Sequence, residues 1–448
     1  MTVDERSTVA RPDPAKAGPR GLSPRGVGLA ALFGNTIELY DFVIYAYVGG
    51  AVFGPLFFPT GVPWVGTVLA FTTQALAFFV RPLGAVVFGR IGDRWGRRAP
   101  LLWSVSIMGG ATVAIGLLPT YATVGAAAPI MLLVLRLLQG IAIGGEYPGA
   151  VVVAVEHAPE RRKTLYGAFP QIGNMLGSLL AALLLVVVNL VAGQDAWREW
   201  AWRVPFLGSI VLVVIGFVLR RRLSETPEFV AVTAEAKSRD RVRFADLLRR
   251  SAEPLAIATL FWIGPLAFSY AFLSSLIAFV ASWRPGLSPV DPQIGLVISS
   301  ALLVVVVAVV ARFGDRLGLE RLVLVSGLGI TLWAVPSYLL VDLQNPVALW
   351  TAMAVGSLAY GAFGGVAPRL MATLFPVEFR FLGVGVCIAV SGVLAGAVLP
   401  IPVLAWVGET GGSSVPLMLM VVTAGLATVA GALWLMAYRK RQAKTTTV

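Results

Sequence analysis

Long apolar runs separated by short polar segments repeat along the whole chain. A helix needs roughly 20 mostly apolar residues to cross the hydrocarbon core of a bilayer. Twelve runs meet that requirement, at about 27–54, 64–90, 99–119, 125–156, 164–192, 203–220, 254–283, 293–312, 321–341, 346–374, 381–407 and 415–438. The pattern predicts an all-α polytopic membrane protein with twelve transmembrane helices.

Two of the polar loops carry nearly the same residues half a chain apart. Gly92-Asp93-Arg94-Trp95-Gly96-Arg97-Arg98 is followed 222 residues later by Gly314-Asp315-Arg316-Leu317-Gly318. A second pair, Pro159–Arg162 and Pro376–Arg380, repeats at an offset of 217 to 218 residues. Repeats at the half-period predict two six-helix bundles related by pseudo-twofold symmetry, an arrangement common in transporters.

The repeat also sets the expected domain boundaries. We expect a disordered tail, a first bundle, a linker, a second bundle and a second tail at 1–26, 27–220, 221–252, 253–438 and 439–448. Within the linker, an amphipathic basic piece from Phe244 to Arg250 is expected to lie on the anionic inner leaflet.

Composition excludes several classes of protein. The chain is 57% hydrophobic and 13% charged, whereas soluble domains carry about a quarter charged residues. A single cysteine, Cys387, excludes a disulfide framework and a thiolate metal site, and the lone His157 cannot form a histidine-rich centre. We therefore expect neither a metal nor a cofactor. His157 is interpreted as an ordinary histidine at the edge of a loop, with a pH-sensing role as the alternative.

The positive charge reports membrane topology. Of the 35 Lys and Arg residues, 29 lie in the two tails and in alternate loops, three lie in the opposite loops and three lie inside the runs. This asymmetry predicts a multi-pass protein of the cell inner (plasma) membrane whose two termini both lie in the cytoplasm. Because the basic residues follow the loops, the net charge of +12 does not indicate nucleic acid. The expected partners are a lipid bilayer, a small-molecule substrate and a proton, and we expect a monomer.

The loop after the second run could hold the cytoplasmic side of the two bundles together in one state. Its glycines permit close approach and a tight turn, its aspartate can meet a helix N-terminus or an arginine, and its arginines anchor it at the surface. These residues are Gly89, Gly92, Asp93, Arg94, Gly96, Arg97 and Arg98. The alternative is a solvated turn whose arginines serve only membrane topology.

The second copy of this loop, with Asp315 and Arg316, has Leu319 and Glu320 in its continuation. We therefore expect the first copy to carry most of the gating. Arg369 lies about two turns from the cytoplasmic end of its run, which favours gating or snorkelling. Glu156 is a candidate partner for Arg97 or Arg220.

Six ionisable residues lie inside the runs, where charge is costly and often marks a transport pathway. They are Glu38, Asp41, Arg81, Arg136, Glu146 and Arg369. Asn35, Glu38, Asp41 and Tyr45 lie close to one face of the first helix. Two carboxylates one turn apart are costly to ionise together, so one could carry a proton. The alternative is a carboxylate locked to Arg81 or Arg136 as a structural pair.

Arg81 lies deep in its run, where its planar guanidinium suits a substrate carboxylate. A permanent bridge to Glu38 or Asp41 is the alternative. Arg136, Gln139 and Glu146 project from one sector of the fourth helix, so one of them could line a cavity. The other expected polar lining residues are Tyr45, Gln74, Gln171, Asn174 and Tyr360.

A series of motifs in the first half carries a family resemblance. The segments are Gly34–Phe42, Phe57–Pro59, Arg81-Pro82-Leu83-Gly84, Arg136–Gly140, Gly144-Gly145-Glu146, Val155–Pro159, Phe169–Gly173, Trp202–Phe206 and Glu225–Phe229. In order and spacing, the chain resembles the metabolite:proton symporter family of the major facilitator superfamily. The sequence of residues 155–173 is most similar to that of the shikimate transporters of that family.

The resemblance implies a twelve-helix symporter that works by alternating access on organic acids or zwitterionic osmolytes. A shikimate-like acid or a dicarboxylate is the favoured substrate. Leu39 departs from the family's usual tryptophan, and 260–283 lacks its tyrosine-rich pattern. The competing functions are a drug or metabolite exporter on the same fold and a transport-derived membrane sensor. The chain shows no phosphate loop or nucleophile constellation, so we do not expect an enzyme.

Overall fold

The structure is a computed structural model that describes residues 24–60, 63–95, 98–144, 146–221, 244–288, 290–376 and 380–446. These residues are almost entirely helical. Eleven helical stretches among them are long and apolar enough to cross a membrane, and a shorter apolar helix occupies Leu102–Gly116. Together they account for the twelve predicted spans, and the all-α polytopic prediction is confirmed.

The described part of residues 24–221, here called the first half, contains ten α-helices. Their bounds are α1 Pro24–Val48, α2 Gly54–Phe57, α3 Pro63–Trp95, α4 Arg98–Gly116, α5 Tyr121–Val124, α6 Ala127–Ile143, α7 Glu146–Glu156, α8 Lys163–Gly167, α9 Phe169–Ala196 and α10 Arg203–Arg221. Within this half, α1 packs against α9 and α10, and α6 packs between α3 and α4.

Residues 244–446 are the second half, and eight α-helices lie among those of them that the structure describes. Their bounds are α12 Phe244–Tyr270, α13 Leu276–Trp283, α14 Asp291–Leu317, α15 Leu319–Asp342, α16 Pro346–Leu374, α17 Arg380–Val393, α18 Pro400–Glu409 and α19 Val415–Thr446. Here α16 packs against α14 and α15, while α19 packs against α12 and α15.

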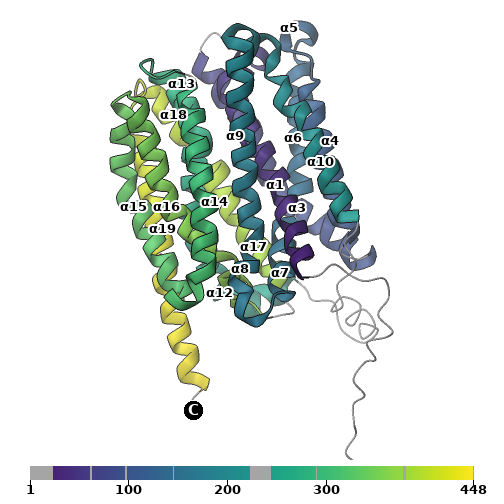
Figure 1. Cartoon of the computed structure of the whole chain (residues 1–448), viewed down its shortest axis with the longest axis vertical. Coiled ribbons are helices and arrows are strands. Elements are labelled where there is room, and N and C mark those ends of the chain that lie inside the picture. Colours follow the sequence, from purple (N-terminus) through teal and green to yellow (C-terminus); the bar gives the residue numbers. More distant parts are fainter. Residues whose placement is uncertain are drawn as a thin grey trace, which may run out of the picture.

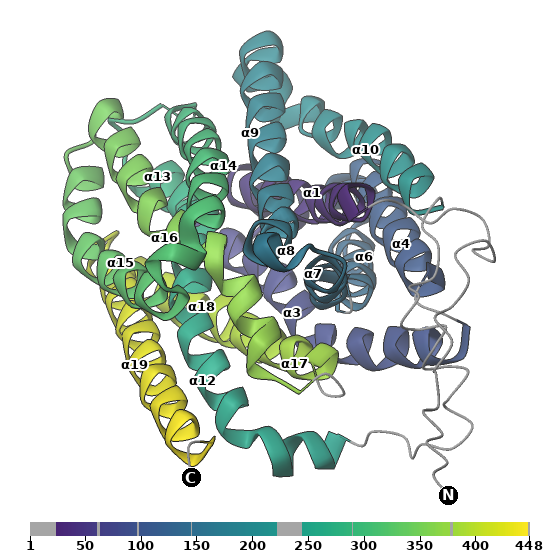
Figure 2. The ribbon, with the colours of Figure 1, turned by 60° about the horizontal axis from the view of Figure 1, so that its bottom comes forward.

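The two halves lie side by side, with their helices running along the same long axis (Figure 1). The helices α9 and α14 pack against each other along one side of the junction, and α17 packs against α3 and α7 on the other. Figure 2 shows the same division from below, with α1, α3, α7 and α8 facing the second half. A cavity at this junction is therefore lined by both halves.

Both halves begin with the same irregularity. A π-helical turn at Gly49–Phe53 directly follows α1, and one at Ala271–Ser275 directly follows α12. Their separation equals the offset between Asp93 and Asp315. A π-helical turn inserts one extra residue into a helix and often lies beside a functional site. This backbone feature repeats at the period that the loops show.

Close packing of α1 on α9 depends on two glycines one turn apart. A Cβ atom at Gly173 would collide with the carbonyl oxygen of Leu32, and one at Gly177 with that of Thr36. The backbones therefore approach more closely than any larger residue allows, as is common between membrane helices.

The end of the bundle that carries α8 and the last turns of α19 is here called the inner end, because the charge asymmetry predicts that it faces the cytoplasm. At this end α19 continues beyond the predicted boundary at 438, as far as Thr446. Arg439 pairs with Glu320 and Arg441 pairs with Glu253, so two ion pairs fasten the extension to α15 and α12.

The predicted linker is partly helical. The described chain resumes at α12, whose first seven residues are set off by a kink at Ser251 (φ −132°, ψ 23°). Leu247 is buried and Leu248 is 45% exposed. The amphipathic segment expected at the membrane surface is thus a short helix attached to the second half.

Candidate functional site

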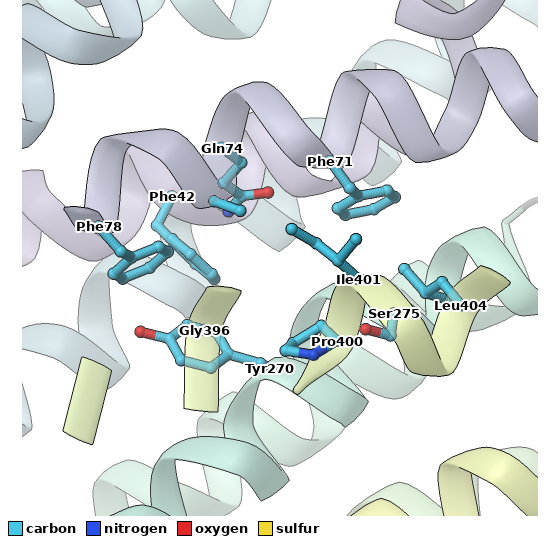
Figure 3. A pocket seen from close by; sticks show the side chains of 11 residues that line it. Phe42, Phe71, Gln74, Phe78, Tyr270, Ser275, Gly396, Pro400, Ile401 and Leu404 are labelled. Carbon is cyan, nitrogen blue, oxygen red and sulfur yellow. The ribbon is translucent and has the colours of Figure 1, made fainter. Parts of the chain in front are cut away.

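A small cavity lies between the halves, outward of the ion pair described below (Figure 3). Its lining residues are Phe42, Phe71, Gln74, Ala75, Phe78, Tyr270, Ser275, Gly396, Pro400, Ile401 and Leu404. The space open to the centre of a water molecule is about 20 Å³, enough for one or two waters. The structure is therefore a contracted state, and a metabolite needs a wider site.

Gln74 is the one amide among the residues that line this cavity. Its side chain comes from α3 and is directed into the space between Phe42 and Ile401 (Figure 3). The residue is 5% exposed, and neither its amide oxygen nor its amide nitrogen has a hydrogen-bond partner. Buried polar groups are almost always hydrogen-bonded, so this amide is free to bind a ligand or water.

The pair Glu38–Arg81 joins α1 to α3 and is loosely held. The closest approach, between Arg81 Nη1 and Glu38 Oε1, is 3.9 Å. Glu38 Oε2 and Arg81 Nε are buried without hydrogen-bond partners. The Arg81 guanidinium carbon lies 4.1 Å from the ring centroid of Phe78. A partly buried ion pair with unsatisfied buried atoms is costly, so both groups can bind new partners.

By contrast, Asp41 is fully engaged within the first half. One carboxylate oxygen accepts hydrogen bonds from Thr112 at 2.8 Å and Gln139 at 3.0 Å, and the other lies 3.0 Å from Arg136 Nη1. The Arg136 guanidinium carbon lies 3.2 Å from the ring centroid of Tyr45. This cluster joins α1, α4 and α6 and is the structural pair that the sequence left as an alternative for Asp41.

Glu146 forms a second internal cluster. It pairs with Arg220 and accepts a hydrogen bond of 3.0 Å from Ser104, so α7, α10 and α4 meet at this carboxylate. Of the two partners predicted for Glu156, Arg220 binds Glu146 instead, and Arg97 lies outside the described residues, so that alternative stays a prediction. Glu156 lies 3.2 Å from Arg380 of the second half. The distance in sequence between these residues gave no indication of either pairing.

The other predicted polar residues lie nearer the inner end of the junction. Gln171 accepts a hydrogen bond of 3.1 Å from Tyr147. Asn35 donates to the carbonyl oxygen of Ala31 at 2.8 Å, and its own side-chain oxygen has no partner. The side-chain oxygen of Asn174 is also unpartnered.

At the inner end, the second copy of the charged loop contacts the other half. Asp315 pairs with Arg369 within the second half and accepts a hydrogen bond of 2.5 Å from Thr164 of α8. Arg369 also donates to the Thr164 hydroxyl at 2.7 Å. Arg316 is exposed. The cluster Thr164–Asp315–Arg369, here called the inner latch, together with Glu156–Arg380 closes the junction at this end.

The first copy of the charged loop is described only in its backbone. Gly89, Gly92, Asp93 and Arg94 lie in the last turns of α3, and Arg98 begins α4. Gly96 and Arg97, and the side chains of the other loop residues, lie outside the described residues. The expectation that this copy carries most of the gating therefore stays a prediction.

The opposite end is also closed. Tyr47 of α1 accepts hydrogen bonds from Gln293 of α14 and, at 3.1 Å, from Asn189 of α9. Nearer the middle of the same helices, the hydroxyls of Ser178 and Ser300 lie 2.7 Å apart. Contacts between the halves at both ends and a small cavity between them describe an occluded state.

Several residues of this arrangement were not predicted from the sequence. Phe78 and Tyr270 make an edge-to-face contact with ring centroids 5.2 Å apart, and Thr164 holds the inner latch. A signal for Phe78 was present, since it lies between Gln74 and Arg81 at helical spacing on α3. A threonine in an apolar run carries no comparable signal.

Comparisons with known proteins agree with this architecture. Residues 59–386 match the model of the family described as Major Facilitator Superfamily. The inner membrane metabolite transport protein YhjE of Escherichia coli is 34% identical over 90% of this chain and 92% of its own, and the shikimate transporter of Escherichia coli is 33% identical over 89% and 91%. A solved proton:xylose symporter with bound 6-bromo-6-deoxy-D-glucose shares the fold, with a TM-score of 0.71 at 15% identity over 93% of this chain and 95% of that one.

These relatives are transporters, and the chain is a multi-pass membrane transporter rather than an enzyme. The twelve spans, the half-chain repeat and the cavity between the halves are the features that such a carrier requires. The chain belongs to the major facilitator superfamily, in its metabolite:proton symporter family.

Proposed function

We propose that the chain imports a small organic acid or zwitterionic metabolite together with a proton. The supporting observation is the loose pair of Glu38 and Arg81, which faces the junction between the halves and leaves buried polar atoms unpartnered. The names of the relatives, a metabolite transport protein and a shikimate transporter, support the same class of substrate.

In the proposed cycle a proton binds the Glu38 carboxylate and removes its charge. The Arg81 guanidinium then loses its one anionic partner and can bind a substrate carboxylate through two parallel N–H···O hydrogen bonds. Neither charge is stable alone in a dry cavity. Proton and substrate therefore enter and leave together, which is the requirement of symport.

Alternating access follows from the contacts between the halves. The inner latch and the Glu156–Arg380 pair would open toward the cytoplasm, and the contacts of Tyr47 and Ser178 would open toward the opposite side. We propose both termini on the cytoplasmic side, bundles at 27–220 and 253–438, and a monomer as the working unit. In this cycle Asp41, Arg136 and Glu146 hold the first half rigid.

Uptake into liposomes that contain the purified protein tests the proposal. An inward proton gradient should drive accumulation of a labelled acid or zwitterion, with shikimate, proline and citrate as the first panel. A drug or metabolite exporter would instead move substrate outward when protons enter. Absence of gradient-dependent uptake of every compound in the panel, from preparations that bind them, would count against symport.

A further inference from the structure

A second small pocket lies between the halves, on the outward side of the cavity shown in Figure 3. The space open to the centre of a water molecule is about 20 Å³ in each of the two. The lining of this outer pocket includes Trp64 and Val68 of α3, Phe279 and Ser282 of α13, and Leu404 and Gly408 of α18. Leu404 also lines the cavity, so one side chain forms a wall of both spaces.

The two spaces follow one line along the junction, because the same helices pass both of them. On α3, Val68 lines the outer pocket, and Phe71 and Ala75 line the cavity. Their i, i+3, i+7 spacing places them on one face of the helix. On α18, Leu404 and Gly408 are one turn apart and line the outer pocket together. The helices α3 and α18 belong to different halves and pack against each other.

Phe71 and Leu404 close the space between the outer pocket and the cavity. Both side chains are buried, and they form an apolar cluster against which Val68 packs. They lie at the same end of the cavity (Figure 3). An apolar constriction excludes water and can act as a gate. Because its two sides come from different halves, this constriction opens when the halves separate.

Exposure to solvent changes across this contact. Ser275 lines the cavity and is 2% exposed, whereas Ser282 lines the outer pocket and is exposed. The two serines are seven residues apart on one continuous helical stretch, which is about 10 Å along its axis. A path from the surface through the outer pocket therefore ends at Leu404 and Phe71 in this occluded state.

We propose that the outer pocket is part of the transport path and that Leu404 and Phe71 form the gate between this pocket and the cavity. The substrate passes along the facing sides of α3 and α18 when the gate opens. The proposal rests on the transport function above, but not on the identity of the substrate or of the coupled ion.

Thiol labelling of the full-length protein in detergent tests the gate without requiring transport. In a Cys387→Ser parent, Ser275→Cys places a thiol in the cavity and Ser282→Cys places one in the outer pocket. The probe is 2-aminoethyl methanethiosulfonate, a small charged reagent. Ser282→Cys should react about ten-fold or more faster than Ser275→Cys, because the reagent reaches the cavity only in molecules that have opened. This comparison leaves the gate intact, so it stays informative if a gate variant does not fold.

Variants at the gate then assign the barrier. Leu404→Ala removes most of one wall and should raise the labelling rate of Ser275→Cys about ten-fold or more, since a large-to-small change at a buried apolar contact destabilises the closed form. Phe71→Ala should have the same effect from the other half. Leu417→Ala is the matched control, because Leu417 is buried in the second half and lines neither space. That variant should keep the labelling rate of the parent.

Three results would overturn the proposal: equal labelling at the two serine positions in the parent, an unchanged rate at Ser275→Cys in both gate variants, or an equal increase in Leu417→Ala. Uptake into liposomes by the parent reports separately on the function. Labelling that depends on the gate, without proton-driven uptake, would support this path and count against symport. Proton-driven uptake, with labelling that does not respond to the gate variants, would support symport and overturn the path.

Discussion

Thr164 ties the two halves together at the inner end, so its replacement should open that end. The residue is 1% exposed, and its hydroxyl donates to Asp315 and accepts from Arg369. Thr164→Val removes both hydrogen bonds with almost no change in shape. The ion pair between Asp315 and Arg369 stays, because both residues belong to the second half.

The size of the effect follows from those two bonds. A hydrogen bond to a charged partner contributes about 1.5–3 kcal/mol, and solvent screens the partly exposed Asp315 and Arg369. We expect a combined loss of about 1.5–3 kcal/mol relative to an open state that makes neither bond. Since about 1.4 kcal/mol is a factor of ten, the ratio of open to closed inner ends should rise roughly ten- to hundred-fold.

Distance measurements by double electron–electron resonance can detect this change. Labels at Arg161→Cys and Leu317→Cys sit on exposed positions of the two halves. The chain has one native cysteine, the buried Cys387, so a Cys387→Ser background leaves only the two labels. Thr164→Val should move population from the short distance to a longer one, and Thr164→Ser should restore the short distance. If the valine and serine variants gave the same distribution, the latch would not be a determinant of the inner gate.

Two further variants test the packing and charge assignments through thermal unfolding in detergent. Gly177→Ala places a methyl group against the Thr36 carbonyl and should destabilise the fold by about 1–3 kcal/mol. Gly110→Ala is the control and should have no destabilising effect, because a Cβ there meets nothing within 4 Å. Equal melting temperatures for the two variants would contradict the close contact between α1 and α9. Asp41→Asn leaves Arg136 buried without its anion and should lower stability by about 3–5 kcal/mol, and a wild-type melting temperature would show that the pair is not structural.

The span pattern and the loop repeat were sufficient to predict the architecture. The length of each apolar run predicts a membrane-spanning helix, because the thickness of the bilayer sets that length. The half-chain repeat predicts how the helices divide into two halves. The π-helical turns at Gly49–Phe53 and Ala271–Ser275 repeat at the same offset, although no residue pattern within them indicated the turn.

Pairings within the site could be predicted only as alternatives. Both Glu38 and Asp41 were candidates for the proton and for a structural bridge. They lie close to one face of the first helix, and the sequence does not show how that helix is rotated about its own axis. The rotation of α1 in the bundle decides between them, because it turns Asp41 toward α4 and α6 and leaves Glu38 at the junction. The backbone of α1 packs closely on Gly173 and Gly177 of α9, which lie far away in sequence.

The inner latch is a contact between the halves that the sequence did not predict. Because Leu319 and Glu320 follow the second copy of the charged loop, we expected that copy to contribute little to gating. Asp315 nevertheless contacts the other half through Thr164. Glu320 instead pairs with Arg439 on the extension of α19. The partner that restores the contact is a neutral residue in an apolar segment, and charge patterns do not reveal it.

In the proposed cycle Glu38 carries the coupled proton, and its amide variant separates proton coupling from substrate movement. In liposomes, Glu38→Gln should abolish accumulation driven by a proton gradient and retain exchange of labelled for unlabelled substrate at equal pH, because the neutral amide mimics a carboxyl that is always protonated. Gradient-driven accumulation that persists in Glu38→Gln would show that Glu38 does not carry the coupled proton.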